Sequence, residues 1–90
     1  MTGWRLEYDP AAVRWLRKAD RQTARRIRDA LTAVVGTGDP RCRGKALTGS
    51  LAGLWRYRVG DYGIVCDIHD SRLIVLVIDI GNRDHVYANR

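Results

Sequence analysis

The sequence predicts an α+β fold, in the order β-α-α-β-β-β, with two N-terminal helices packed on one face of a small, largely antiparallel sheet. Three observations predict it: apolar residues alternate near the N-terminus, two segments before residue 37 have helical spacing, and three strand-length segments follow residue 53. The 90 residues suffice for one hydrophobic core, so we predict a single domain over residues 1–90.

The first strand is predicted at residues 4–8, where large apolar side chains alternate with charged ones. Asp9 and Pro10 then begin a helix, because aspartate caps a helix N-terminus and proline fits its first position. This helix continues to about Ala19, since apolar residues keep helical spacing at Ala12, Trp15 and Leu16.

A second helix is predicted to begin after its cap, Asp20, and to end near Gly36. Its apolar stripe consists of Ala24, Ile27, Leu31 and Val34. The other faces of the two helices carry the basic residues Arg14, Arg17, Lys18, Arg21, Arg25, Arg26 and Arg28. We interpret this charge as a solvated surface rather than a dedicated RNA-binding surface, because a polar helix face is usually just the solvent side.

Residues 37–53 are rich in Gly, Pro, Ser and Thr and are predicted to form a long loop. The loop carries three basic residues, Arg41, Arg43 and Lys45. Loops of this length inside a compact domain are often functional.

Gly60 and Asp61 predict a two-residue hairpin turn of type II′, which has glycine at its first central position. The turn sets the register of the residues facing one another, which are Val59 with Tyr62, Arg58 with Gly63, and Arg56 with Val65. One face of this hairpin is expected to pack on the helices and consists of Trp55, Tyr57, Val59, Tyr62, Ile64 and Cys66. Arg56, Arg58 and Gly63 share the opposite face.

A turn at Asp70 and Ser71 is predicted to lead into the last strand, residues 73–80. The strand is almost entirely apolar, which is typical of a central strand covered on both faces. Two cysteines make no disulfide framework: Cys66 is expected in the core, and Cys42 is expected as a free thiol in the basic loop. The set Cys66, His69 and His85 matches no zinc spacing, so we predict no metal site.

The chain is basic, with 16 Lys and Arg against 10 Asp and Glu and a net charge of +6. Most of these residues are arginines, which bind phosphates through two parallel hydrogen bonds, so nucleic acid is the leading partner class. Solubility alone is the alternative explanation. The N-terminus lacks the pattern of a secretory signal, and the longest apolar run, residues 73–78, is too short to span a bilayer. We therefore expect a cytoplasmic protein without membrane contact.

Several segments make the chain resemble the RelE/ParE toxin superfamily, and within it the RelE side. They are Gly38–Pro40, Lys45–Gly49, Gly53–Tyr62, Gly81–Arg83 and Val86–Tyr87. The resemblance covers nearly the whole chain and implies one RelE-like toxin domain of a type II toxin–antitoxin system. It implies a ribosome-dependent mRNA endonuclease that cuts by attack of a 2′-hydroxyl, without metal or cofactor. It also implies a cognate RelB-like antitoxin that forms a hetero-oligomer, blocks the active surface and contacts operator DNA.

The resemblance assigns roles to residues of the last third of the chain. Arg56 and Arg58 match basic positions of the family, and since arginine stays protonated they are expected to bind phosphate and stabilise its charge. Arg83 matches an arginine that contacts the scissile phosphate. Tyr87 matches a tyrosine proposed to stack on the base or to take the 2′-hydroxyl proton. His85 is another candidate acid or base, because its unperturbed pKa lies near neutrality, but a surface role stays open.

Basic loop residues and two departures complete the predicted site. Lys45, with Arg41 and Arg43, is expected to bind the backbone of mRNA or ribosomal RNA. The family usually has an arginine at the position of Gly63, next to Arg58 in the predicted register, and often a histidine at the position of Asn82. These departures leave three interpretations open: a weakened toxin, an inactive variant, or a member that uses different groups.

Two other functions remain compatible with the sequence. One is a ParE-like gyrase poison, which has the same fold but a protein target. The other is a catalytically inactive toxin that keeps only antitoxin and operator roles.

Overall fold

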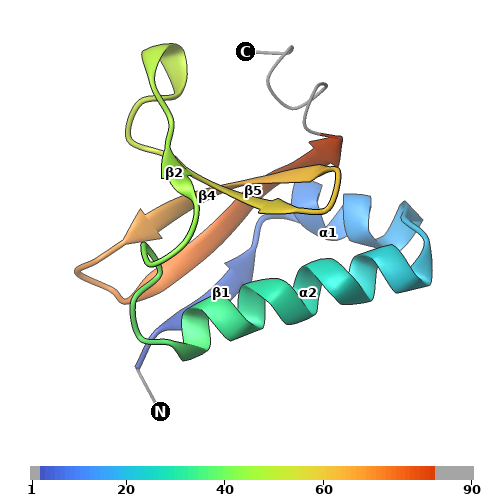
Figure 1. The fold of residues 1–90 in the computed structure, drawn as a ribbon, viewed down its shortest axis with the longest axis horizontal. Coiled ribbons are helices and arrows are strands. Elements are labelled where there is room, and N and C mark those ends of the chain that lie inside the picture. The colour runs from blue at the N-terminus through green and yellow to red at the C-terminus, as the bar shows by residue number, and fades with distance from the viewer. Residues whose placement is uncertain (1–2, 83–90) are drawn as a thin grey trace.

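The computed structural model describes residues 3–82, which form two helices on one face of a five-stranded sheet (Figure 1). The elements are β1 (Arg5–Tyr8), α1 (Pro10–Lys18), α2 (Arg21–Gly36), β2 (Lys45–Ala46), a 3-10 turn (Gly49–Leu51), β3 (Trp55–Val59), β4 (Tyr62–His69) and β5 (Ile74–Asn82). The strand order is β1-β5-β4-β3-β2, with β1 parallel to β5 and the other pairs antiparallel. The predicted fold class is confirmed. Within residues 3–82, no helix is long and apolar enough to cross a membrane.

Both helices begin at the predicted aspartate caps. The Asp9 carboxylate accepts a hydrogen bond from the Ala11 N–H at 3.1 Å, and the Asp20 carboxylate accepts one from the Thr23 N–H at 3.2 Å. These bonds satisfy N–H groups that have no partner within the helix.

The end of α2 differs slightly from the prediction. Gly36 is the last residue of the helix, but the turn away from the axis is made after it, by Thr37 and Gly38. The Thr37 hydroxyl donates to the Val34 carbonyl at 2.7 Å, and Gly38 has φ of +83°, a left-handed conformation that favours glycine.

The hydrophobic core lies between the helices and the sheet. The β3–β4 hairpin has the predicted register, and Tyr57, Ile64 and Cys66 are buried on the predicted face. Trp55, Val59 and Tyr62 pack at the margin of the same core. Burial raises the pKa of the Cys66 thiol, so this cysteine is a neutral core residue, as expected. Cys42 is a free, exposed thiol, also as expected.

The central strand β5 contains a β-bulge that the sequence did not predict. Val65 pairs with Asp79, whereas the next residue of β4, Cys66, pairs with Val77, so Ile78 is the extra residue. Val77 and Ile80 both belong to the buried core. In regular alternation, Asp79 would share the face of Val77 and lie under the helices. The bulge therefore places Asp79 on the face of the sheet that the helices leave uncovered.

The loop that joins α2 to β3 is more ordered than the sequence predicted. Residues 37–53 contain the two-residue strand β2 and a 3-10 turn, because Lys45 and Ala46 pair with Arg56 and Trp55 of β3. This pairing extends the sheet beyond β3 and brings a basic loop residue onto it.

Candidate functional site

Three basic residues meet on the uncovered face of the sheet. Lys45 of β2 lies directly opposite Arg56 of β3, and Arg58 follows two residues later on the same face. We call Lys45, Arg56 and Arg58 the cationic patch. Directly opposite residues of an antiparallel pair have Cβ atoms about 5 Å apart, and like charges there repel. An anion between such side chains relieves the repulsion, so the arrangement suits a phosphate group.

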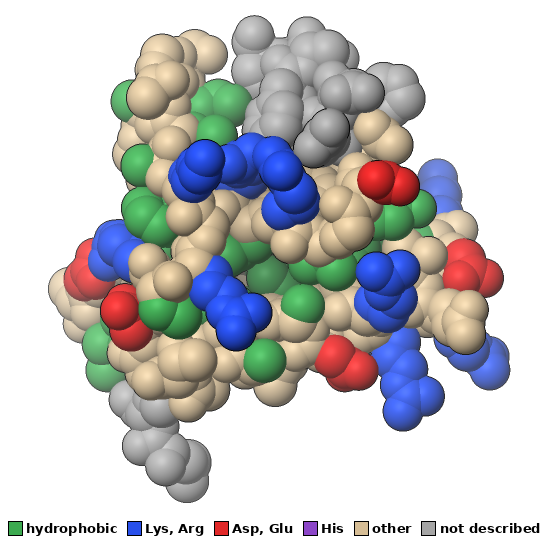
Figure 2. Space-filling model, viewed as in Figure 1, with side chains coloured by type: hydrophobic (Ala, Val, Ile, Leu, Met, Phe, Trp, Pro, Cys, Tyr) green, Lys and Arg blue, Asp and Glu red, His purple; other side chains and the backbone are tan. Residues whose placement is uncertain are grey.

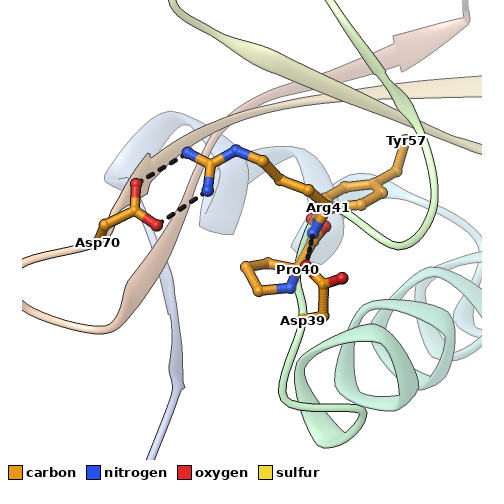
Figure 3. A network of polar contacts seen from close by, with 5 residues as sticks. All are labelled: Asp39, Pro40, Arg41, Tyr57 and Asp70. Carbon is orange, nitrogen blue, oxygen red and sulfur yellow. Dashed lines mark hydrogen bonds and ion pairs between the residues drawn. The ribbon is translucent and has the colours of Figure 1, made fainter.

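The loop before the patch is held in place by side chains of β3 and of the turn between β4 and β5 (Figure 3). The Arg41 guanidinium donates two hydrogen bonds to the Asp70 carboxylate, at 2.8 and 2.9 Å, and so ties the loop to the turn between β4 and β5. The buried Tyr57 hydroxyl donates to the Pro40 carbonyl. The Trp55 indole donates to the Arg43 carbonyl at 2.7 Å. These contacts hold residues 40–43 against β3 and thereby position Lys45 beside Arg56.

The ionisation of these groups agrees with their contacts. The hydrogen bonds from Arg41 lower the pKa of Asp70, so this ion pair contributes to stability above the carboxyl's unfolded pKa and loses that contribution in acid. Burial raises the pKa of the Tyr57 hydroxyl, which therefore stays protonated and able to donate at neutral pH.

Gly44 lies where the loop approaches β3 most closely. Its φ is +85°, and a Cβ atom at this position would lie 2.2 Å from the Arg56 carbonyl oxygen and 2.6 Å from the Trp55 indole nitrogen. Any side chain here would push β2 away from β3. Glycine is therefore required on two grounds, backbone conformation and space.

We expect Gly44→Ala to reduce the free energy of unfolding by about 3 kcal/mol or more, because left-handed strain adds to a backbone clash. Gly53→Ala is the matched control, since Gly53 also has positive φ (+95°), but a Cβ atom there would have no neighbour within 4 Å. It should cost only the strain, about 1–2 kcal/mol. Urea unfolding of both variants measures the difference, and equal losses would contradict the close approach at Gly44.

A groove of about 340 Å³ adjoins the cationic patch. Its apolar wall comes from α2, and its other wall comes from the loop and β3. The groove is lined by Ala30, Leu31, Ala33, Val34, Arg43, Gly44, Lys45, Arg56, Tyr57, Arg58 and Val59. Figure 2 shows basic side chains around an apolar hollow on this side of the molecule. The groove therefore combines an apolar surface with positive charge.

The structure brings together some of the predicted site residues. Lys45, Arg56 and Arg58 form the patch, and Arg43 lines the groove. Arg41 instead points to Asp70, and its guanidinium lies 5.9 Å from the centre of the Trp55 ring. RNA binding by Arg41 stays a prediction, and the structure adds a role for it in holding the loop.

Of the other predicted site positions, some lie within the residues that the structure describes and some lie outside them. Gly63 lies opposite Arg58, as predicted, and faces Gly81 of β5 on its other side. Arg83, His85 and Tyr87 lie outside the described residues. Their roles, and those of the patch residues, stay predictions.

Sequence reasoning missed two acidic residues on the uncovered face. Asp79 occupies the same row of the sheet as Lys45, Arg56 and Val65. Asp67 lies one row further along β4 and binds the His69 side chain at 3.1 Å. The signal for Asp79 was available, because it is the sole charged residue between positions 73 and 82.

A metal site needs several His, Cys, Asp or Glu side chains that converge on one point, and residues 3–82 can be judged on that requirement. This part of the chain contains no group of three or more His, Cys, Asp or Glu side chains placed to hold one. What the patch itself offers to a ligand is fixed positive charge and N–H donors.

A family model and several solved structures match this chain. The model described as ParE toxin of type II toxin-antitoxin system, parDE, matches residues 6–87. No curated protein sequence matches the chain.

Three solved structures illustrate the likeness. A chain of the Mycobacterium tuberculosis RelBE2 toxin–antitoxin complex is 24% identical, with 92% of this chain and 94% of that chain covered and a TM-score of 0.71. The isolated Escherichia coli RelE toxin is 23% identical, with 96% and 93% covered and a TM-score of 0.73. A chain of the archaeal RelE–RelB complex from Pyrococcus horikoshii is 20% identical, with 90% and 96% covered and a TM-score of 0.70. At these identities the structural matches establish a shared fold.

Proposed function

The chain belongs to the ParE toxin family of type II toxin–antitoxin systems, and from that premise we propose that it is a ribosome-dependent mRNA endonuclease that cuts by 2′-hydroxyl attack. In this reaction the 2′-oxygen attacks the neighbouring phosphorus and leaves a cyclic phosphate. The phosphate gains negative charge in the transition state. Fixed positive groups aimed at that charge supply the stabilisation.

The cationic patch is the observation that carries this proposal. Arg56 and Arg58 project from adjacent same-face positions of β3, and β2 adds Lys45 beside them. Two arginines held on a strand offer several N–H donors in fixed directions to the oxygens of one phosphate. Arg83 and Tyr87, if they act as the family resemblance implies, add a further phosphate contact and a base-stacking or proton-accepting group.

The family model is described by the parDE system, and a ParE-like gyrase poison is the second function that stays compatible with the sequence. This second function uses a protein target and needs no phosphate site. The patch favours RNA cleavage. Against it, Gly63 stands where the family usually has an arginine beside Arg58. A toxin that has lost catalysis and keeps only its antitoxin contact is the third possibility.

Primer extension on translating ribosomes tests the proposal directly. We expect the purified chain to produce mRNA breaks within the ribosomal A site, and to produce none on the same mRNA without ribosomes. A gyrase supercoiling assay with the same preparation separates the second function. Inhibited supercoiling without mRNA breaks would replace the nuclease proposal by the gyrase one.

We also propose a RelB-like antitoxin as partner, because several of the structures similar to this chain are RelE–RelB complexes. The groove between α2 and β3 suits the apolar side of an amphipathic helix. The basic residues that line the groove suit acidic residues of the partner helix that flank its apolar side.

The groove assignment gives a quantitative prediction. Ala33→Arg should weaken binding of the co-expressed antitoxin by about tenfold or more, because a bulky charge enters an apolar surface. Thr32→Arg is the control, since Thr32 is exposed on the same helix but does not line the groove. Affinity is measured by titration of the separated proteins. Equal affinities for the two variants would move the antitoxin away from this groove.

A further inference from the structure

The proposed reaction needs a proton acceptor, and the cationic patch contains none. Arginine and lysine side chains carry only donors when protonated. A general base must accept the 2′-hydroxyl proton as the oxygen attacks phosphorus. We infer that Asp79 is this base; the inference rests on the proposed function.

The β-bulge is the first observation for this role. Without the extra residue Ile78, alternation would place Asp79 in the core under the helices. With the bulge, a carboxylate stands on the sheet face that carries the patch. Bulges are over-represented next to active sites, where they redirect one side chain.

The register is the second observation. Lys45, Arg56, Val65 and Asp79 form one continuous row across β2, β3, β4 and β5. Neighbouring strands lie about 4.8 Å apart, so the backbones of Arg56 and Asp79 are separated by about 10 Å. Val65, which lies between them in the row, is fully buried. One nucleotide bridges this separation, with its phosphate at the arginines and its 2′-hydroxyl at Asp79.

The charges around Asp79 support a catalytic rather than a core role. Arg56 and Lys45 lie in the same row on β3 and β2, and Arg58 and Asp67 lie on the same face in the neighbouring rows. Asp67 is less suited to act as the base, because it lies further along β4 from Gly63, the residue that pairs with Arg58. Asp67 therefore serves as a matched comparison on the same face.

The step balances as an acid–base reaction. The Asp79 carboxylate takes the 2′-hydroxyl proton, and the 2′-oxygen forms a bond to phosphorus. The bond from phosphorus to the 5′-oxygen of the next nucleotide breaks, which leaves a 2′,3′-cyclic phosphate. The departing 5′-oxygen takes a proton from an acid, for which the sequence offers His85 or Tyr87. Asp79 then returns its proton to water.

The test compares Asp79→Asn with Asp67→Asn in single-turnover cleavage on ribosomes, in the wild-type chain and in a Gly63→Arg background. We expect Asp79→Asn to slow cleavage by about 100-fold or more, the usual contribution of a general base, and Asp67→Asn to leave the rate nearly unchanged. Antitoxin affinity should be equal for all variants, which shows that they are folded.

Two readouts separate a base from a merely structural residue. The wild-type rate should fall in acid as a carboxylate gains a proton, and Asp79→Asn should lose that dependence. Formate should partly restore cleavage to Asp79→Ala, since a free carboxylate then occupies the vacated position. An unchanged rate in Asp79→Asn, or an unchanged acid limb, overturns the inference while leaving the nuclease function intact. Absence of cleavage by both parent chains instead rejects the nuclease function, and the inference falls with it.

Discussion

Replacing Arg58 by alanine is expected to reduce ribosomal mRNA cleavage by about 100- to 1,000-fold, the usual effect of removing one donor that stabilises transition-state charge. Arg58 is exposed on the uncovered face of β3, so its removal should not disturb the core. The same loss is expected for Arg83→Ala if it contacts the scissile phosphate. Growth arrest on expression, together with primer extension, measures both effects.

The control for Arg58→Ala must remove a positive charge elsewhere. Arg14→Ala fits, because Arg14 is exposed on α1, and α1 packs against the opposite face of the sheet. If net charge alone mattered, both variants would lose activity equally. A fully toxic Arg58→Ala, Arg83→Ala double variant would reject the site assignment altogether.

The second large effect is expected at Gly63. Gly63→Arg should raise cleavage by about 100-fold, because it adds a guanidinium beside Arg58 where the transition state forms. The strand permits the change: Gly63 lies in regular antiparallel pairing between Arg58 and Gly81, a backbone conformation open to any residue. Gly81, its partner on β5, has no side chain, and both glycines are buried.

The Gly63→Ala variant distinguishes the effect of an added positive charge from the effect of a stiffer strand. Both substitutions replace a strand glycine and restrict the unfolded chain, but only arginine adds a phosphate ligand. We expect alanine to leave the cleavage rate close to that of the wild type. Equal gains for alanine and arginine would show that Gly63 limits the rigidity of the strand rather than the charge of the site. If neither variant nor the wild type cuts, the nuclease proposal fails.

Much of the fold was predictable because its signals are local. Asp9 and Asp20 cap the helices through residues two and three positions away, and Gly60 fixes the register of the β3–β4 hairpin. That register alone placed Arg56, Arg58 and Gly63 on one face. The cationic pair of the candidate site therefore follows from a two-residue turn.

The remaining features depend on contacts between distant parts of the chain. β2 forms because Gly44 allows the loop to approach β3 and because Tyr57 and Trp55 bind loop carbonyls. Arg41 pairs with Asp70, 29 positions away. No local pattern indicates that pair, so Arg41 was assigned to RNA. The bulge at Ile78 also depends on distant residues, since it results from the register in which β4 pairs with β5.

The position of β5 has a consequence for how the molecule is made. β5 lies between β1 and β4, yet it is the last described strand of the chain, and it pairs Arg5 with Ile74 across most of the sequence. Helices α1 and α2 therefore lack most of the sheet surface on which they pack until residues 74–82 have left the ribosome. Such long-range pairing slows folding and delays it relative to synthesis. The nascent chain consequently cannot complete the sheet face that carries the cationic patch until residues 74–82 have been translated.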